Sequence, residues 1–216
     1  MGPINPDPAR GQHTHMASWQ ISGLVRRALV VAVLCLSLLG YLEKTGAEEA
    51  AVDEVPPNRY GMGLLYGNTF SPGSDIGFAQ ISGFGLFDYA KVWHHPAPKL
   101  LRWKLEGTIG STTMPQARFM ASLGMLALYY LDFISTHYTR PYIEGGIGGI
   151  YTDFQVKGQG SRINFNPQAG LGMDVTVGPG LPFYVAARVH HISNAGLNHE
   201  NKGVNSAVLM FGRYLK

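Results

Sequence analysis

Residues 183–193 read FYVAARVHHIS, and the alternation along this stretch is the basis of the fold we expect. Its odd positions carry Phe, Val, Ala and Val before they turn polar at His191 and Ser193, whereas its even positions include Arg188 and His190. Successive side chains of a β-strand point to opposite faces, so this stretch has one apolar face and one partly charged face. That pattern is typical of a membrane barrel whose charged residues point inward.

Similar stretches of roughly ten residues recur along the chain and are separated by clusters of Gly, Pro, Asn and Asp. We expect eight strands, at residues 59–70, 77–91, 100–112, 117–132, 140–153, 162–177, 182–193 and 205–215. Eight such strands match the smallest membrane barrel, whose closed sheet pairs every backbone group. The predicted fold class is therefore all-β, an eight-stranded antiparallel transmembrane β-barrel. The alternative is a water-soluble barrel or sandwich with its apolar residues inside.

The composition agrees with a β protein whose surface does not all face water. Of the 216 residues, 28 are glycine, 11% are aromatic and only 14% are charged, whereas about 25% charged residues is usual in soluble proteins. The net charge of +3 is too small to indicate a nucleic-acid partner. The single cysteine, Cys35, excludes a disulfide framework and a Cys-x-x-Cys metal site.

The N-terminal segment has the pattern of a secretory signal. Two arginines precede the apolar run 28–42, which is shorter than the roughly 20 residues of a membrane-spanning helix, and a small-residue cleavage site ends at Ala47. We expect residues 1–47 to be an N-terminal extension with a cleavable signal peptide, with Met16 as an alternative start, and residues 48–216 to form the barrel. An uncleaved membrane anchor is the alternative for the first segment.

A candidate catalytic group lies where the last two predicted strands meet. His191 and Ser193 share one face of their strand, so the imidazole can reach the hydroxyl. A serine hydroxyl becomes a useful nucleophile when a base takes its proton, and the base needs a third group to orient it. Asn205 lies on the corresponding face of the next predicted strand, where its side chain can accept a hydrogen bond from the imidazole.

The turn between these strands is rich in hydrogen-bond donors. Asn194, Gly196 and Asn201 offer N–H groups that could stabilise an oxyanion. The simpler interpretation is that such residues form an ordinary turn at the membrane interface, because Asn and Gly clusters are common in turns. A shared metal ion is not expected, since the adjacent His190 and His191 point to opposite faces of the strand, and ester hydrolysis by serine and histidine needs no metal or organic cofactor.

The segment His191-Ile-Ser-Asn-Ala-Gly196, followed by Asn201-Lys-Gly-Val-Asn-Ser206, resembles the signature of the lipid A 3-O-deacylase (PagL) family. The resemblance implies an enzyme of the bacterial outer membrane, an eight-stranded barrel that contacts membrane lipids. It also implies hydrolysis of the ester-linked acyl chain at position 3 of lipid A. Carried over by position, Ser193 is the nucleophile and His191 is its general base.

Three turn residues and one strand residue complete the implied site. The resemblance associates Asn194, Gly196 and Asn201 with the oxyanion, and it places the family's triad acid, a glutamate, at Asn205. An asparagine can orient a histidine through its carbonyl oxygen but lacks the carboxylate charge. Glu200 is the nearest alternative carboxylate.

Two other functions compete with the esterase. The change at Asn205 favours a non-enzymatic outer-membrane barrel, structural or lipid-binding, with a degenerate site. A pore is a third function, which is disfavoured because side chains fill the interior of an eight-stranded barrel. The sequence leaves open whether the protein is a monomer or a homodimer.

Overall fold

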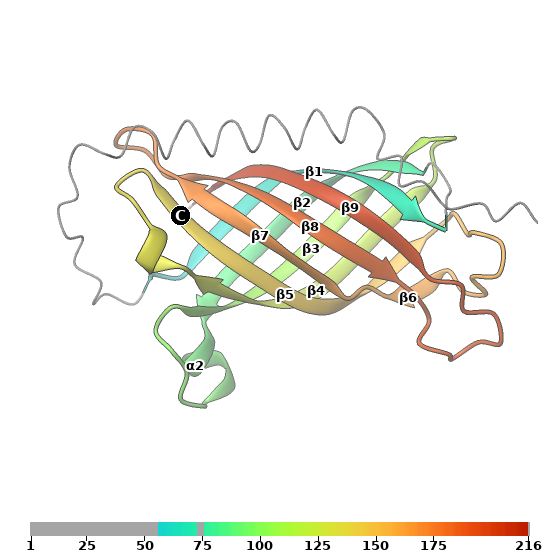
Figure 1. The fold of residues 1–216 in the computed structure, drawn as a ribbon, viewed down its shortest axis with the longest axis horizontal. Coiled ribbons are helices and arrows are strands. Elements are labelled where there is room, and N and C mark those ends of the chain that lie inside the picture. Colours follow the sequence, from blue (N-terminus) through green and yellow to red (C-terminus); the bar gives the residue numbers. More distant parts are fainter. Residues whose placement is uncertain (1–55, 73–75, 216) are drawn as a thin grey trace, which may run out of the picture. The chain divides into compact units, whose positions relative to one another are not determined.

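The structure, a computed structural model, describes residues 56–72 and 76–215, and these form a sheet of long strands (Figure 1). The predicted extension and signal peptide at 1–47 lie outside the described residues. The strands, in chain order, are β1 (Arg59–Ser71), β2 (Gly77–Asp88), β3 (Leu101–Met114), β4 (Phe119–Tyr130), β5 (Thr139–Thr152), β6 (Ile163–Phe165), β7 (Gln168–Val175), β8 (Phe183–Ile192) and β9 (Val204–Tyr214). Two short helical turns lie between strands, α2 (Tyr89–Trp93) and η1 (Asp132–Ile134).

The sheet closes on itself. Strands that are neighbours in the sheet pair antiparallel, β1 pairs with both β2 and β9, and β4 pairs with both β3 and β5. Both β6 and β7 pair with β5, so these two strands together take the place of one. The predicted eight-stranded antiparallel barrel is therefore confirmed.

Six strands lie within two residues of their predicted bounds, and two differ more. The strand predicted at 77–91 ends at Asp88, whose carboxylate accepts a hydrogen bond from the Lys91 N–H at 3.2 Å and caps α2. The strand predicted at 162–177 is interrupted at Pro167, because proline has no N–H to give to the ladder. The Pro167 carbonyl still accepts a bond from His191 N at 2.9 Å, so the break does not open the barrel.

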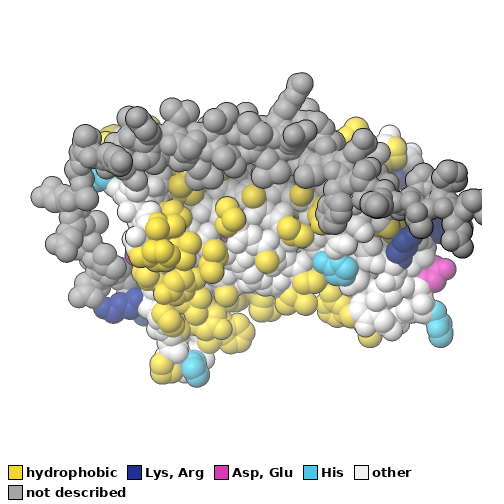
Figure 2. Space-filling model, viewed as in Figure 1, with side chains coloured by type: hydrophobic (Ala, Val, Ile, Leu, Met, Phe, Trp, Pro, Cys, Tyr) yellow, Lys and Arg dark blue, Asp and Glu magenta, His cyan; other side chains and the backbone are white. Residues whose placement is uncertain are grey.

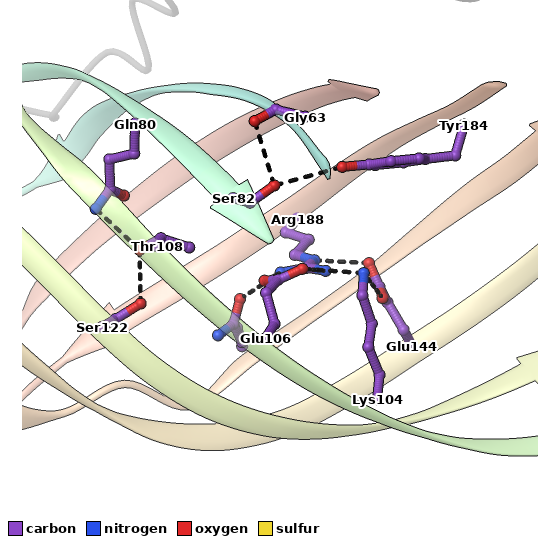
Figure 3. A network of polar contacts seen from close by, with 11 residues as sticks. Gly63, Gln80, Ser82, Lys104, Glu106, Thr108, Ser122, Glu144, Tyr184 and Arg188 are labelled. Atoms are coloured by element: carbon purple, nitrogen blue, oxygen red, sulfur yellow. Dashed lines mark hydrogen bonds and ion pairs between the residues drawn. The ribbon is translucent and has the colours of Figure 1, made fainter. Parts of the chain in front are cut away.

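Charged side chains fill the middle of the barrel and neutralise one another (Figure 3). Arg188 donates to Glu144 Oε1 at 2.6 Å and to Glu106 Oε2 at 3.1 Å. Lys104 lies 3.0 Å from Glu106 and 3.4 Å from Glu144, and Arg188 also donates to Gln168. All four charged residues are at most 4% exposed. Removal of one partner would leave an unpaired buried charge, which strongly destabilises a fold. The contacts therefore stabilise the association of β3, β5, β7 and β8.

The outer surface has the opposite character. Outward-facing side chains such as Leu64, Leu123 and Leu171 are apolar and 60% or more exposed. Among the outward-facing positions of the described strands, Arg213 is the only Lys, Arg, Asp or Glu. Figure 2 shows the same distribution, with apolar side chains spread over the barrel wall and charged ones toward its ends. Such a surface suits hydrocarbon rather than water.

The two ends of the barrel carry different connections (Figure 1). At one end, termed the loop end, lie the β5–β6 loop (153–162) and the β8–β9 loop (193–203). At the other, termed the helix end, lie α2, η1 and the end of β9. In the described ranges, 56–72 and 76–215, no helix is long and apolar enough to span a membrane.

Replacement of Arg188 by methionine should destabilise the barrel strongly, because it leaves two buried carboxylates facing only Lys104. We expect a loss of about 3–5 kcal/mol in the free energy of unfolding. Urea titration in lipid vesicles, followed by the shift of the folded band on unheated gels, measures it. Arg162→Met is the control, because it breaks only an exposed ion pair with Asp153. It should leave the urea concentration at the midpoint of unfolding unchanged. Equal midpoints for the two variants would contradict a structural role for the buried network.

Candidate active site

A histidine and an asparagine form a hydrogen-bonded pair on the outer face at the loop end. His191 of β8 lies directly opposite Asn205 of β9, and His191 Nδ1 is 2.7 Å from Asn205 Oδ1. An amide oxygen can only accept a hydrogen bond, so Nδ1 carries the proton. In the neutral form of such an imidazole the lone pair is on Nε2, where it can act as a base.

Ser193 continues the line of β8 past its last residue. Its backbone exchanges two hydrogen bonds with Phe165, at 2.8 and 3.1 Å, which extends the alternation so that Ser193 and His191 share the outward face. The Ser193 hydroxyl forms no hydrogen bond with any residue in the described part of the chain. Catalytic hydrogen bonds are often loose before a substrate binds, so this geometry is compatible with transfer of the hydroxyl proton to Nε2.

Gly203 makes room for the imidazole. A Cβ atom at this position would lie 2.5 Å from Cε1 of His191 and 3.1 Å from its Nε2. The ring therefore lies directly against the Gly203 backbone, and only glycine leaves the necessary space. The sequence alone assigned no role to Gly203. Glycine is common in turns for conformational reasons, and strand alternation does not indicate which side chain packs against it.

Asn194 forms hydrogen bonds with both long loops at the loop end. Its side chain is only 2% exposed, and its Nδ2 donates to the Gln159 carbonyl at 3.0 Å and to the Glu200 carbonyl at 2.7 Å. A second bond between the loops runs from Asn198 Nδ2 to the Gly160 carbonyl at 2.9 Å. The backbone that follows the predicted nucleophile is thus held from both sides.

The predicted oxyanion donors lie together in the β8–β9 loop, but they are engaged to different degrees. The Gly196 N–H donates to Asn194 Oδ1 at 3.0 Å, and the Asn194 N–H donates to Asn201 Oδ1 at 2.8 Å. The Asn201 Nδ2 group and the Ala195 N–H have no partner among the described residues. These two donors remain available to a bound molecule.

The remaining predicted residues lie apart from the His191–Asn205 pair. The alternative acid, Glu200, is exposed in the loop, and the His191 Nδ1 atom that it would have to orient already contacts Asn205. His190 points into the barrel, where it is 3% exposed and stacks on Phe78 with ring centroids 6.3 Å apart. No cluster of three or more His, Cys, Asp or Glu suited to a metal ion occurs among the described residues.

An apolar groove of about 400 Å³ lies beside Ser193. It includes Asn194, which follows Ser193 in the chain, and Phe165, which pairs with its backbone. The groove runs over the outer face of β5 and β6, and its apolar side chains are Ile147, Ile163, Phe165 and Leu197. The arrangement therefore combines a half-buried imidazole and hydroxyl on the outer face with an apolar surface that suits a hydrocarbon chain.

Comparison with known sequences identifies the family of this chain. A family model described as lipid A 3-O-deacylase (PagL) matches residues 84–214, which include His191, Ser193 and Asn205. The chain belongs to the lipid A 3-O-deacylase (PagL) family. The lipid A deacylase PagL of Pseudomonas aeruginosa is 32% identical over 93 residues, or 42% of this chain and 51% of that protein. The match thus spans about half the length of this curated relative.

The fold of this chain is similar to that of a solved structure. The crystal structure of neisserial surface protein A (NspA) is 16% identical and matches 74% of this chain and 96% of its own, with a TM-score of 0.56. The crystal structure of the outer membrane enzyme PagL is 23% identical and matches 70% of this chain and 97% of its own, with a TM-score of 0.49. This PagL-family protein is an outer-membrane β-barrel, and its apolar outer surface suits the hydrocarbon of a membrane.

Replacement of Gly203 by alanine should displace the His191 ring, because the new Cβ would overlap Cε1. We expect lipid A deacylation by this PagL-family protein to fall on the order of 100-fold while the barrel stays folded. Release of fatty acid from lipid A measures the rate, and Gly83→Ala is the control, because a Cβ at Gly83 meets nothing within 4 Å. Equal rates for the two variants would show that Gly203 does not position the imidazole.

Proposed function

We propose that this protein is a serine esterase that removes the acyl chain ester-linked at position 3 of lipid A in the outer membrane. Membership of the lipid A 3-O-deacylase (PagL) family supports the substrate and the reaction. The observation that carries the mechanism is the 2.7 Å hydrogen bond between His191 and Asn205, on the lipid-facing side and two residues from Ser193. Lipid A and the surrounding outer-membrane lipids are the partners that this location implies.

The proposed chemistry uses the two side chains that share the outward face of β8 and its extension. His191 Nε2 takes the proton of the Ser193 hydroxyl as its oxygen attacks the ester carbonyl carbon. The tetrahedral intermediate collapses, the sugar oxygen leaves with the proton from the imidazolium, and the acyl group stays on Ser193. A water molecule, activated by the same imidazole, then hydrolyses this acyl-enzyme and releases a 3-hydroxy fatty acid.

Donors for the oxyanion come from the β8–β9 loop. We assign this role to Asn201 Nδ2 and the Ala195 N–H, since neither has a partner in the described chain. Asn194 and Gly196 shape the loop through the hydrogen bonds that engage their own N–H groups. In other acyl-transfer enzymes, one such donor contributes about 2.7–4 kcal/mol to transition-state stabilisation.

The groove beside Ser193 is the proposed place for the acyl chain. Its apolar side chains face outward, at the same barrel wall that contacts lipid. A chain lying there would keep its hydrocarbon out of water while its ester reaches Ser193. This arrangement lets the protein act on a substrate that never leaves the membrane.

Mass spectrometry of lipid A incubated with the detergent-purified protein tests the function. We expect the loss of one 3-hydroxyacyl group with the wild type, and no loss with Ser193→Ala or His191→Ala. Ser111→Ala is the matched control, because Ser111 is an outward-facing, half-buried serine at the loop end of another strand. An intact substrate with the wild type, on lipid A that carries a 3-O-acyl chain, would refute the esterase and favour a non-enzymatic barrel.

Asn205 gives a second prediction. Asn205→Asp keeps the size of the side chain and adds the charge that stabilises the imidazolium, and Asn205→Glu restores the family residue. A charged acceptor strengthens a hydrogen bond by about 1–1.5 kcal/mol, so we expect kcat to rise about tenfold in at least one of the two variants. Asn205→Leu should lower kcat. Unchanged rates in all three variants would show that Asn205 does not orient His191.

A further inference from the structure

This barrel has few cationic side chains. Some lie at the helix end, far from Ser193, and others lie at the loop end, which contains Ser193. Arg140 and Arg213 lie at the helix end, near the start of β5 and the end of β9. Arg140 is held by Asp132 through two bonds of 2.8 Å, and Arg213 lies over the ring of Phe183. Neither can meet a substrate bound at the loop end.

Three of the cations at the loop end lie in the two long loops. Arg162 is bound to the carboxylate of Asp153 at 3.0 Å, so its charge is neutralised locally. Lys157 of the β5–β6 loop and Lys202 of the β8–β9 loop are both exposed and form no ion pair within the described residues. These two lysines are therefore the loop cations that could meet an anion beside Ser193.

The backbone holds the two lysines next to each other. The Lys202 N–H donates to the carbonyl of Gly158 at 2.7 Å, and Lys157 is the residue before Gly158. The side chain of Lys202 lies over this glycine, since a Cβ at Gly158 would be 3.5 Å from Lys202 Cβ and 3.8 Å from its Cδ. The two aliphatic stems thus start from adjoining points on the surface.

Lys202 is also next to the catalytic group along the chain. The residue before it, Asn201, accepts the N–H that follows Ser193, and the residue after it, Gly203, lies under the His191 ring. The backbone of Lys202 is therefore flanked by two residues that contact the segment of Ser193 and the His191 ring. Its long side chain starts from this rim of the site, over the β5–β6 loop.

We propose that Lys157 and Lys202 form a phosphate-binding subsite for the phosphate on carbon 1 of the glucosamine ring that carries the 3-O-acyl chain. This inference rests on the proposed function, because lipid A supplies a phosphate on the same ring as the reacting ester. Ammonium groups bind phosphate as compact point charges, and two of them on adjoining loops exceed the opposing charge of the exposed Glu200. The subsite would place the ester over Ser193 and select phosphorylated substrate.

The test compares kcat/KM for bisphosphorylated lipid A with kcat/KM for monophosphoryl lipid A that lacks the 1-phosphate. We expect the wild type to prefer the phosphorylated substrate by about tenfold or more, as one to two charge-assisted bonds imply. The Lys157→Gln/Lys202→Gln variant should process both substrates at similar rates. Glu200→Gln should increase the preference, because it removes the opposing charge.

Arg118→Gln is the matched control, because Arg118 is an exposed cation at the same end but in the loop between β3 and β4. Its preference should equal that of the wild type. Preference retained in the double lysine variant, or lost equally in Arg118→Gln, would overturn the subsite. A wild type that deacylates both substrates equally would overturn it too, while leaving the esterase intact.

A binding measurement separates this inference from the proposed reaction. Detergent-solubilised Ser193→Ala protein is titrated with each lipid A by calorimetry, and then the same protein with both lysines replaced by glutamine. We expect about tenfold tighter binding of the 1-phosphorylated lipid only when the lysines are present. Equal affinities in the Ser193→Ala protein would refute the subsite even if no lipid A were hydrolysed.

Discussion

The closure of β1 on β9 is the constraint on which the rest of the structure depends. In hydrocarbon a free N–H or C=O group finds no water, so a sheet in the membrane cannot keep an edge. Once the sheet is closed, each strand has one face toward lipid and one toward the barrel interior. The alternation of side chains along every strand then follows from this single requirement.

The closed sheet separates neighbouring residues into two environments. Arg188 and His190 of β8 point inward, where Arg188 joins the network with Glu106 and Glu144. His191, the next residue, points outward and pairs with Asn205. Charge in the interior network is neutralised and stabilises the barrel, whereas the polar pair on the outside lies near the loop end of the barrel wall.

The candidate site is formed by side chains of the barrel wall and by loops that the wall brings together. The β8–β9 pairing places the imidazole opposite its amide partner. The β8–β9 loop, to which we assign the oxyanion donors, is held by the β5–β6 loop through bonds from Asn194 and Asn198 to its carbonyls. The candidate site on the outer wall therefore depends on contacts between two loops at the loop end.

The sequence by itself determined the closed barrel, the faces of its strands and the family. Period-two alternation is a local property, so it predicted that Arg188 and His191 lie on opposite faces. Alternation did not predict that the strand at 162–177 is interrupted at Pro167. The pairing of His191 with Asn205 also followed, because adjacent antiparallel strands place equivalent faces side by side.

Only the tertiary structure decided how the loops are used. Asn194 and Gln159 are 35 residues apart, and they meet because closure brings the ends of β5 and β8 to the same rim. The space that Gly203 leaves for the imidazole, and the neighbouring positions of Lys157 and Lys202, depend on the same rim. Local sequence patterns report which face a residue takes, but contacts between distant loops depend on the register and curvature of the whole barrel.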